Sequence, residues 1–319
     1  MDDVILDIQN LSIHYPTFDG VVKAVERVDL EIPRGEVVGL VGESGCGKST
    51  LGLSILRLIR PPGKIVSGKI VFQGKNIVKK TETQMRELRG SAISMVFQDP
   101  MTSLNPLVRI DKHFIETIRT HEKDIKKEEA IKRIERLVEH LGISPSRLKD
   151  FPHQLSGGMR QRIMIGLGLI LNPRLIIADE PTNSLDVIVE AHFLDLLKKL
   201  KEEYKLTILL ITHNMGIVAQ LAERVAVMYA GKIVEVGEVN ELYGDPLHPY
   251  TKGLLASIPN INVEQEKLET MPGSPPDLID LPSGCPFHPR CPKVMDICRV
   301  TEPHGITKDG RIVECFLYK

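Results

Sequence analysis

Neither a long apolar run nor an excess of charge of one sign is present in this sequence. The longest uncharged apolar stretch, residues 163–171, is about half of the ~18–20 residues that a membrane-spanning helix needs. The 41 Lys and Arg residues are balanced by 42 Asp and Glu residues, whereas a nucleic-acid coat needs a basic excess. The first four residues include two aspartates and lack the layout of a signal peptide. We therefore expect a cytosolic protein without nucleic-acid partners, for which docking on a membrane protein stays open.

The 319 residues are enough for about two domains at a typical size of ~150 residues each. Near the N-terminus, residues 24–32 alternate between apolar and polar side chains, which predicts a strand. Beyond residue 151, predicted helices alternate with predicted strands, which indicates a parallel sheet with helices on its faces. The predicted strands are residues 5–13, 20–32, 37–41, 175–178 and 207–212, and the predicted helices are residues 48–60, 157–171, 187–204 and 215–222.

Two further segments depart from this alternation. Residues 111–149 are highly charged and carry apolar residues at helical spacing, so a helical subdomain is expected over about residues 99–151. From about residue 239, Pro and Gly punctuate the chain, which is typical of loops. We predict a main domain over residues 1–238 and a smaller C-terminal extension over residues 239–319.

A glycine-rich run with a lysine lies between a predicted strand and a predicted helix. Residues 42–49 read G-E-S-G-C-G-K-S, which fits the phosphate-loop pattern G-x-x-x-x-G-K-[ST]. Its backbone N–H groups and the N-terminus of the following helix favour the binding of phosphate. Lys48 neutralises the charge of the β- and γ-phosphates, and the Ser49 hydroxyl is suited to bind Mg²⁺. Cys46 occupies a free position and is interpreted as a packing residue. The predicted ATP-binding residues here are Gly42, Glu43, Ser44, Gly45, Cys46, Gly47, Lys48, Ser49 and Thr50.

Two acidic residues, Asp179 and Glu180, end the apolar strand predicted at residues 175–178. In a parallel sheet, chemistry gathers at the carboxyl ends of the strands. Asp179 is therefore a candidate to hold Mg²⁺ through water, and Glu180 a candidate general base toward the attacking water. An acidic pair is common at the end of a strand, so alone it is moderate evidence for catalysis. It becomes strong evidence because it follows a phosphate loop in this order along the chain.

The run at residues 155–162, L-S-G-G-M-R-Q-R, is the motif of this chain that points most specifically to one protein family. Together with the preceding motifs it resembles the ATP-binding-cassette ATPases, over about residues 5–237. The resemblance implies an α/β P-loop NTPase core with a parallel sheet, an antiparallel β subdomain, a helical subdomain and a loop-rich C-terminal extension. It also implies that the signature acts on ATP bound to a second cassette. The signature residues are Leu155, Ser156, Gly157, Gly158 and Met159, with Met159 where the family usually has glutamine.

Four other residues match positions of that family. Tyr15 resembles the aromatic residue that stacks on adenine, with Phe18 as an alternative. Gln98 resembles the glutamine that senses Mg²⁺ and the membrane partner, and His213 resembles the histidine that senses the γ-phosphate. Asp186 lies in the run N-S-L-D, residues 183–186, which resembles the loop that crosses to the opposing cassette. An edge-strand tyrosine, a loop glutamine and a surface histidine are the structural alternatives.

Four of the five cysteines lie in the last 35 residues: Cys285, Cys291, Cys298 and Cys315. Their spacing contains no C-x2-C pair of the kind that zinc sites show. Cysteines of a cytosolic chain are more often metal ligands or free thiols than disulfides. Four thiolates, with Pro286 and Pro292 after two of them, suit an iron–sulfur cluster. Zinc, with His288 as a ligand, and free structural thiols are the alternatives.

The tail resembles the C-terminal extension of oligopeptide and dipeptide importer ATPases, and Met159 points to the first of the two ATPases in such importers. The matching runs are residues 248–251, 273–276 and 284–291. The resemblance implies a [4Fe–4S] cluster, ATP and Mg²⁺ as cofactors, and ATP hydrolysis that powers peptide uptake. Oligosaccharides or nickel are alternative cargoes, because cargo is chosen by other subunits.

The resemblance also implies partners and a location. A second, related cassette completes a heterodimer, two membrane permease subunits form the pathway, and an extracytoplasmic substrate-binding protein delivers cargo. The chain is then peripheral, at the cytoplasmic face of the cell membrane. DNA-repair cassettes carry long coiled coils before the signature, and ribosome-acting ones carry two cassettes; this chain has neither. A soluble iron–sulfur assembly ATPase is a second alternative.

Overall fold

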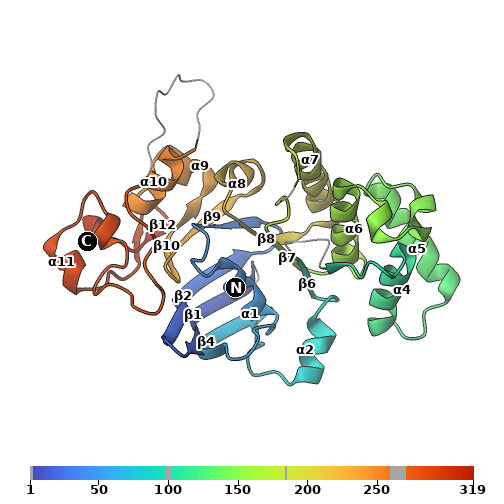
Figure 1. Ribbon diagram of the computed structural model, residues 1–319, viewed down its shortest axis with the longest axis horizontal. Helices are drawn as coiled ribbons and strands as arrows, with labels where there is room; N and C mark the ends of the chain where they lie inside the picture. Colours follow the sequence, from blue (N-terminus) through green and yellow to red (C-terminus); the bar gives the residue numbers. More distant parts are fainter. Residues whose placement is uncertain (1–2, 98–102, 184, 259–270) are drawn as a thin grey trace. The chain divides into compact units, whose positions relative to one another are not determined.

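The computed structural model describes residues 3–97, 103–183, 185–258 and 271–319. The chain divides into two compact units (Figure 1). The first unit combines residues 1–79 with residues 210–319, and the second unit comprises residues 80–209. Within the described ranges, every helix is too short or too polar to cross a bilayer.

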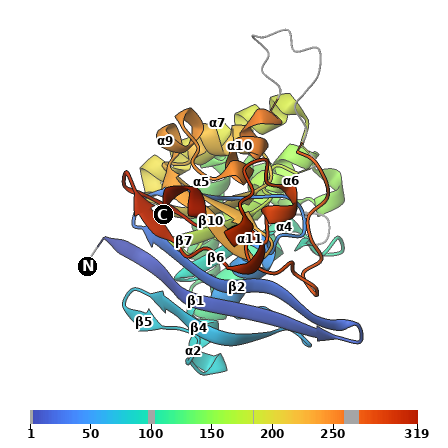
Figure 2. The same cartoon turned by 90° about the vertical axis from the view of Figure 1, so that its left-hand side faces the viewer.

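An antiparallel sheet forms the N-terminal part of the first unit, and Figure 2 shows its strands side by side. The predicted alternation is confirmed over residues 28–32, where Val28, Leu30 and Ile32 are buried and Asp29 and Glu31 are exposed, but it fails at Ala24 and Val25, which are both buried. This sheet is the antiparallel β subdomain implied by the sequence. In the order of the sheet, its strands are β2 (Gly20–Pro33), β1 (Val4–Thr17), β4 (Lys64–Phe72) and β5 (Lys75–Asn76).

A second group of strands in the first unit carries the phosphate loop. β3 (Val37–Val41) lies where a strand was predicted, is buried throughout and runs parallel to β9 (Arg224–Tyr229). β9 continues into β10 (Lys232–Glu238) through Ala230 and Gly231, which both adopt positive φ, as a tight hairpin requires.

The C-terminal extension adds strands to this group. β12 (Arg311–Val313) pairs with β10, and β11 (Ile306–Lys308) pairs with β12. The extension therefore continues a sheet of the first unit. The helices of this unit are α1 (Lys48–Ile55), α8 (Met215–Leu221), α9 (Val239–Gly244), α10 (Pro249–Ala256) and α11 (Asp296–Val300).

Helix α1 ends earlier than the sequence predicts. The expected helix ran to Arg60, but the observed one ends at Ile55. Arg57 adopts φ 52°, in the left-handed region that ends helices. The short helix still keeps its N-terminus at the phosphate loop.

The second unit contains the helical subdomain. Its strands β6 (Ile93–Val96) and β7 (Leu175–Asp179) are parallel, and β8 (Thr207–Thr212) carries the chain back into the first unit. Its helices are α2 (Glu82–Leu88), α4 (Ile110–His121), α5 (Lys127–His140), α6 (Gly157–Leu169) and α7 (Val187–Tyr204).

Two glycines of α6 let its neighbours approach closely. A Cβ on Gly166 would lie 2.8 Å from Leu141 and 3.0 Å from Phe114, and one on Gly168 would lie 3.3 Å from Val96. Glycine weakens a helix by about 1 kcal/mol relative to alanine, so close packing is the compensation expected for it. The expected tight packing is therefore observed.

Candidate functional site

The phosphate loop follows β3 and opens α1, in the context that the motif requires. Gly42 has φ 155° and Gly47 has φ 108°. A Cβ on Gly42 would lie 2.1 Å from the Met228 carbonyl oxygen, and one on Gly47 would lie 2.1 Å from that of Ala24. Only glycine permits such approaches, so the loop backbone is fixed against its neighbours.

Lys48 is the first residue of α1 and is buried. Its Nζ donates to the carbonyl oxygens of Gly42, at 2.8 Å, and Glu43, at 2.9 Å. The ammonium group is therefore held over the curl of the loop. The N-cap of α1, Gly47, supplies no side chain to the first N–H groups, which suits an anion.

Cys46 behaves as a packing residue. It is buried, and burial raises the pKa of its thiol, so the group is neutral at physiological pH. Its sulfur lies 3.8 Å from Lys48 Nζ.

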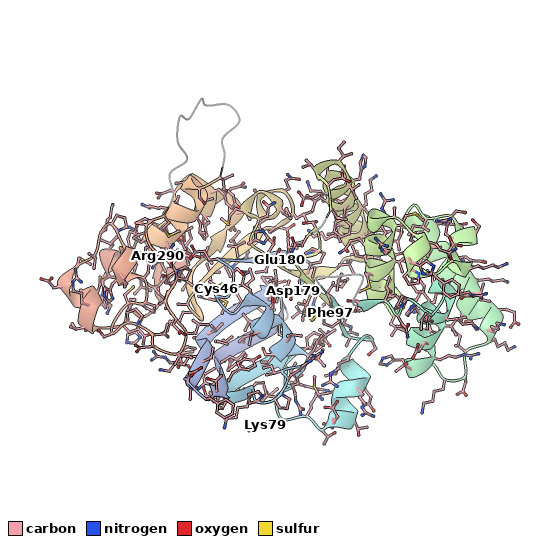
Figure 3. All side chains as sticks on the ribbon, in the orientation of Figure 1. Cys46, Lys79, Phe97, Asp179, Glu180 and Arg290 are labelled. Atoms are coloured by element: carbon pink, nitrogen blue, oxygen red, sulfur yellow. The ribbon has the colours of Figure 1, made fainter. Side chains whose placement is uncertain are left out.

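A contact between the loop and the C-terminal extension was not predicted from the sequence. The Arg290 guanidinium forms a two-pronged ion pair with the Glu43 carboxylate, and Tyr250 Oη accepts from the Glu43 N–H at 2.9 Å. Figure 3 labels Arg290 and Cys46 in the first unit. Both partners lie in runs that carried the family resemblance, but nothing in those runs indicated which residue they contact.

The remaining predicted residues of the first unit lie at the ends of strands. Tyr15 is half-buried on β1, where its Cε1 lies 2.3 Å from the place of a Cβ on Gly63. Its ring therefore covers this glycine. Phe18 is fully exposed in the turn before β2. His213 is exposed directly after β8, next to Asn214, whose side chain caps α8.

Asp179 is the last residue of β7 in the second unit, and Glu180 follows it directly (Figure 3). Asp179 is buried, and Glu180 is half-buried with φ 47°. A non-glycine residue in this region is strained, and such strain gathers at functional sites. The buried Gln161 of α6 donates to the carbonyl oxygen of Pro181, so the signature helix anchors the turn after Glu180.

The signature and the crossing loop start neighbouring helices. Ser156 caps α6 by accepting from the N–H of Met159, and Asp186 caps α7 by accepting from the N–H of Val189. A Cβ on Gly158 would lie 2.7 Å from Val189, so this glycine allows the two helix starts to meet. Next to Asp186, the apolar side chains of Val187 and Ile188 are exposed. Gln98 lies outside the described residues.

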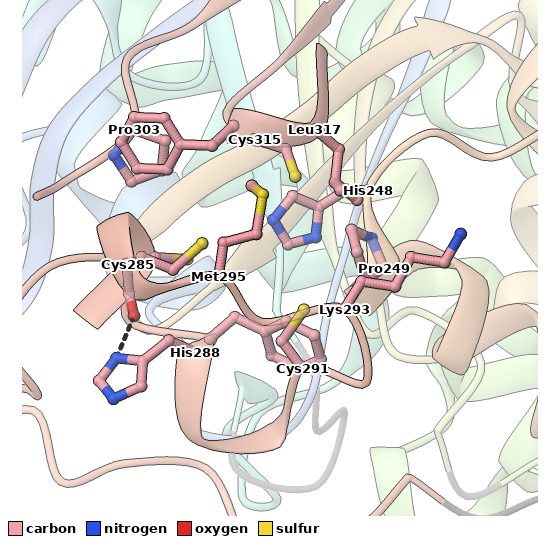
Figure 4. Close-up of a pocket in the computed structure, with 13 residues that line it drawn as sticks. His248, Pro249, Cys285, His288, Cys291, Lys293, Met295, Pro303, Cys315 and Leu317 are labelled. Carbon is pink, nitrogen blue, oxygen red and sulfur yellow. Dashed lines mark hydrogen bonds between the residues drawn. The ribbon is translucent and has the colours of Figure 1, made fainter. Parts of the chain in front are cut away.

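The four C-terminal cysteines line one pocket together with His248 and His288 (Figure 4). Burial raises the pKa of Cys285 to about 11 and also raises the pKa values of Cys291 and Cys315, so these thiols are protonated at neutral pH. His288 contacts the Cys285 carbonyl oxygen at 3.0 Å through its Nδ1.

The described side chains do not form a ligand set for the expected [4Fe–4S] cluster. Among the side chains that the structure describes, no three from His, Cys, Asp and Glu are grouped to hold a metal ion. Met295 also lines the pocket and is drawn between Cys285 and Cys315 in Figure 4. The structure thus gathers the four cysteines in one place without forming a metal-ligand geometry.

Two family models match the chain. The model described as "ABC transporter" matches residues 25–183. The model described as "Oligopeptide/dipeptide transporter, C-terminal region" matches residues 234–298. The second match falls on the extension that contacts the phosphate loop.

Curated relatives match over nearly the full length. The chain is 47% identical to the oligopeptide transport ATP-binding protein AppD of Bacillus subtilis, covering 99% of this chain and 97% of that protein. It is 44% identical to the dipeptide transport ATP-binding protein DppD of the same organism, covering 98% and 94%. It is 42% identical to the oligopeptide transport ATP-binding protein OppD of Salmonella typhimurium, covering 98% and 94%.

Solved structures match the cassette part. A bacterial ABC transporter cassette solved as a dimer gives a TM-score of 0.66 at 28% identity, covering 73% of this chain and 98% of that chain. A second structure of that dimer, in a post-hydrolysis state bound to ADP and phosphate, gives the same values.

Proposed function

Because the chain belongs to the ATP-binding proteins of oligopeptide and dipeptide ABC transporters, we propose the following roles for its residues and the following partners. The chain itself is an ATPase of the ABC family and the ATP-hydrolysing subunit of a peptide importer. The observation that carries this function is the full-length similarity, which includes both the phosphate loop and the C-terminal extension.

The residues of the phosphate loop bind the nucleotide. Lys48, which is buried and bonded to the loop backbone, neutralises the β- and γ-phosphates, and Tyr15 stacks on the adenine. Mg²⁺ would be held by side-chain oxygens, for which Ser49 is the candidate of the first unit and Asp179 and Gln98 are candidates of the second. Bound Mg²⁺ neutralises charge that develops on the phosphates during transfer. The hydroxyl of Ser49 and the carboxylate of Asp179 are hard oxygen donors, which fit this ion.

Glu180 is the general base. It takes a proton from the water that attacks the γ-phosphorus, while the bond from that phosphorus to the bridging oxygen of ADP breaks. The products are ADP and inorganic phosphate. The strained backbone of Glu180 and the anchoring of the next residue by Gln161 support this role. His213 senses the γ-phosphate.

A second cassette completes the machine. Residues 155–159 contact the nucleotide of the opposing subunit, and Asp186 lies in the crossing loop. The exposed Val187 and Ile188 support an interface beside it, as does the dimeric state of the solved relative. We propose a heterodimer with a related cassette, bound to two membrane permeases at the cytoplasmic face and served by a substrate-binding protein.

The test is ATP hydrolysis by the complex reconstituted from the permeases, the substrate-binding protein and both cassettes. Di- and oligopeptides should stimulate hydrolysis, whereas oligosaccharides and Ni²⁺ should leave it at the basal rate. Stimulation by one of these other cargoes and not by peptides would replace the proposed substrate. The Glu180→Gln variant is the control for contaminating ATPases.

For the C-terminal extension we propose a structural [4Fe–4S] cluster held by Cys285, Cys291, Cys298 and Cys315. Its support is the donor set, because four cysteines from separate segments line one pocket. The side chains would have to rearrange for ligation, since the described residues form no metal-holding group. Anaerobic purification and metal analysis should give about four irons and four sulfides per chain. Stoichiometric zinc, or no metal, would overturn the cluster.

A further inference from the structure

Arg290 is a buried arginine of the C-terminal extension that reaches the phosphate loop. Its side chain is 5% exposed. Nη1 lies 2.7 Å from Glu43 Oε2, and Nη2 lies 2.9 Å from Glu43 Oε1, so the pair is bidentate. Nε donates to the Pro272 carbonyl oxygen at 2.9 Å, and Nη1 lies 3.4 Å from Tyr229 Oη. Each of the three guanidinium nitrogens therefore has a partner, which fixes the group in one orientation.

Glu43 is held by its backbone as well as by its side chain. Its N–H donates to Tyr250 Oη at 2.9 Å, and its carbonyl oxygen accepts from Lys48 Nζ at 2.9 Å. Burial raises the pKa of Tyr250, so its phenol stays neutral and accepts this bond. The second residue of the loop is thus fixed between the extension and Lys48.

An aromatic cluster supports both contacts. The Phe287 ring centroid lies 5.2 Å from that of Tyr229 and 5.4 Å from that of Tyr250, in edge-to-face geometry. All three side chains are at most 1% exposed. Phe287 precedes Arg290 by three residues, so the segment that carries the arginine is anchored in the core of the first unit.

The ion pair between Arg290 and Glu43 affects ATP binding, because the Glu43 carboxylate and the phosphates of ATP are both negatively charged. Glu43 places a carboxylate in a loop that binds a polyanion, and an unpaired carboxylate there repels phosphate. The ion pair cancels this charge and directs the carboxylate toward Arg290. Hydrogen bonding to Glu43 in turn raises the pKa of Arg290 above its ordinary value, so the guanidinium stays charged.

We propose that Arg290 is a positioning residue of the ATP site, which cancels the charge of Glu43 and fixes the second residue of the phosphate loop. The C-terminal extension thereby becomes part of the nucleotide site of its own chain. This inference rests on the assignment of the loop to ATP, but goes beyond it by giving the extension a role in nucleotide affinity.

The test is a double-mutant cycle of Arg290→Gln and Glu43→Gln. For each variant, the Kd of a non-hydrolysable ATP analogue and the KM and kcat for ATP are measured. Arg290→Gln should raise Kd and KM about tenfold, because it leaves the Glu43 carboxylate unpaired, with little change in kcat. In the Glu43→Gln background, the same substitution should change Kd less than twofold to threefold, since no carboxylate remains to be cancelled. Arg290→Lys, which keeps the charge, should recover part of the affinity.

Controls separate this role from a structural one. Arg299→Gln removes an exposed arginine of the same extension and should leave Kd unchanged. Unchanged Kd in Arg290→Gln, or an equal loss in both backgrounds, would overturn the proposal. Lys48→Ala tests the loop itself in the same assay. If this variant bound the analogue like the wild type, the assignment of the loop to ATP would fail, independently of the Arg290 cycle.

Discussion

Phe287→Ala should destabilise the first unit, because the extension is part of its core. The Phe287 side chain is 1% exposed and packs on Tyr229, Tyr250 and His248, with ring centroids 5.2, 5.4 and 5.7 Å away. Truncation of a buried phenylalanine to alanine costs about 3–5 kcal/mol, from lost burial and the cavity left behind.

The expected change in the unfolding midpoint follows from the size of the unit. One kcal/mol shifts the midpoint by about 2–4 °C for units of about 150–250 residues, which is the range of the first unit. The midpoint should therefore fall by about 6–20 °C. Differential scanning calorimetry of the purified chain without nucleotide measures it.

The matched control is Val300→Ala in the same extension. Val300 is 76% exposed, so its substitution should stay within about 0.5 kcal/mol of the wild type. A fall of less than about 2 °C for Phe287→Ala would refute the reasoning, because the extension would then be a weakly attached appendage rather than part of the core.

Two further predictions concern the ATP site. Glu180→Gln should keep ATP binding and slow turnover by about 10²- to 10⁴-fold, since the general base is lost and the shape is kept; near-normal steady-state hydrolysis would contradict this role. Tyr15→Ala should weaken nucleotide binding by about 1–3 kcal/mol, by analogy with base stacking on aromatic side chains, measured by titration calorimetry. If affinity drops with Phe18→Ala instead, the exposed ring in the β1–β2 turn is the one that stacks.

Local patterns predicted the main elements of the fold. The alternation predicted at residues 24–32 marked the strand β2, although it holds only over residues 28–32, and residues 37–41 were predicted as a strand and form β3. These predictions succeeded because the period of side chains along a strand is set by which face is buried. Close packing around the glycines of α6 was likewise expected, because glycine destabilises a helix and needs a compensating reason.

Contacts between distant segments were not predictable in this way. Glu43 and Arg290 are 247 positions apart, and no local period relates them. The strands β11 and β12 have three residues each, too few for alternation to mark them, so they were not predicted in the extension, which was expected to be rich in loops. The cysteine spacing indicated a metal centre, but spacing does not fix where the side chains point, and the described pocket has no metal-holding group.

Peptide uptake into proteoliposomes tests the central claim most directly. The permeases, the substrate-binding protein and both cassettes are reconstituted, ATP is supplied on the cassette side, and accumulation of a labelled peptide is measured. The account predicts ATP-dependent accumulation that is lost when this chain carries Glu180→Gln. ATP hydrolysis without accumulation of any peptide, or accumulation that persists in the variant, would contradict it.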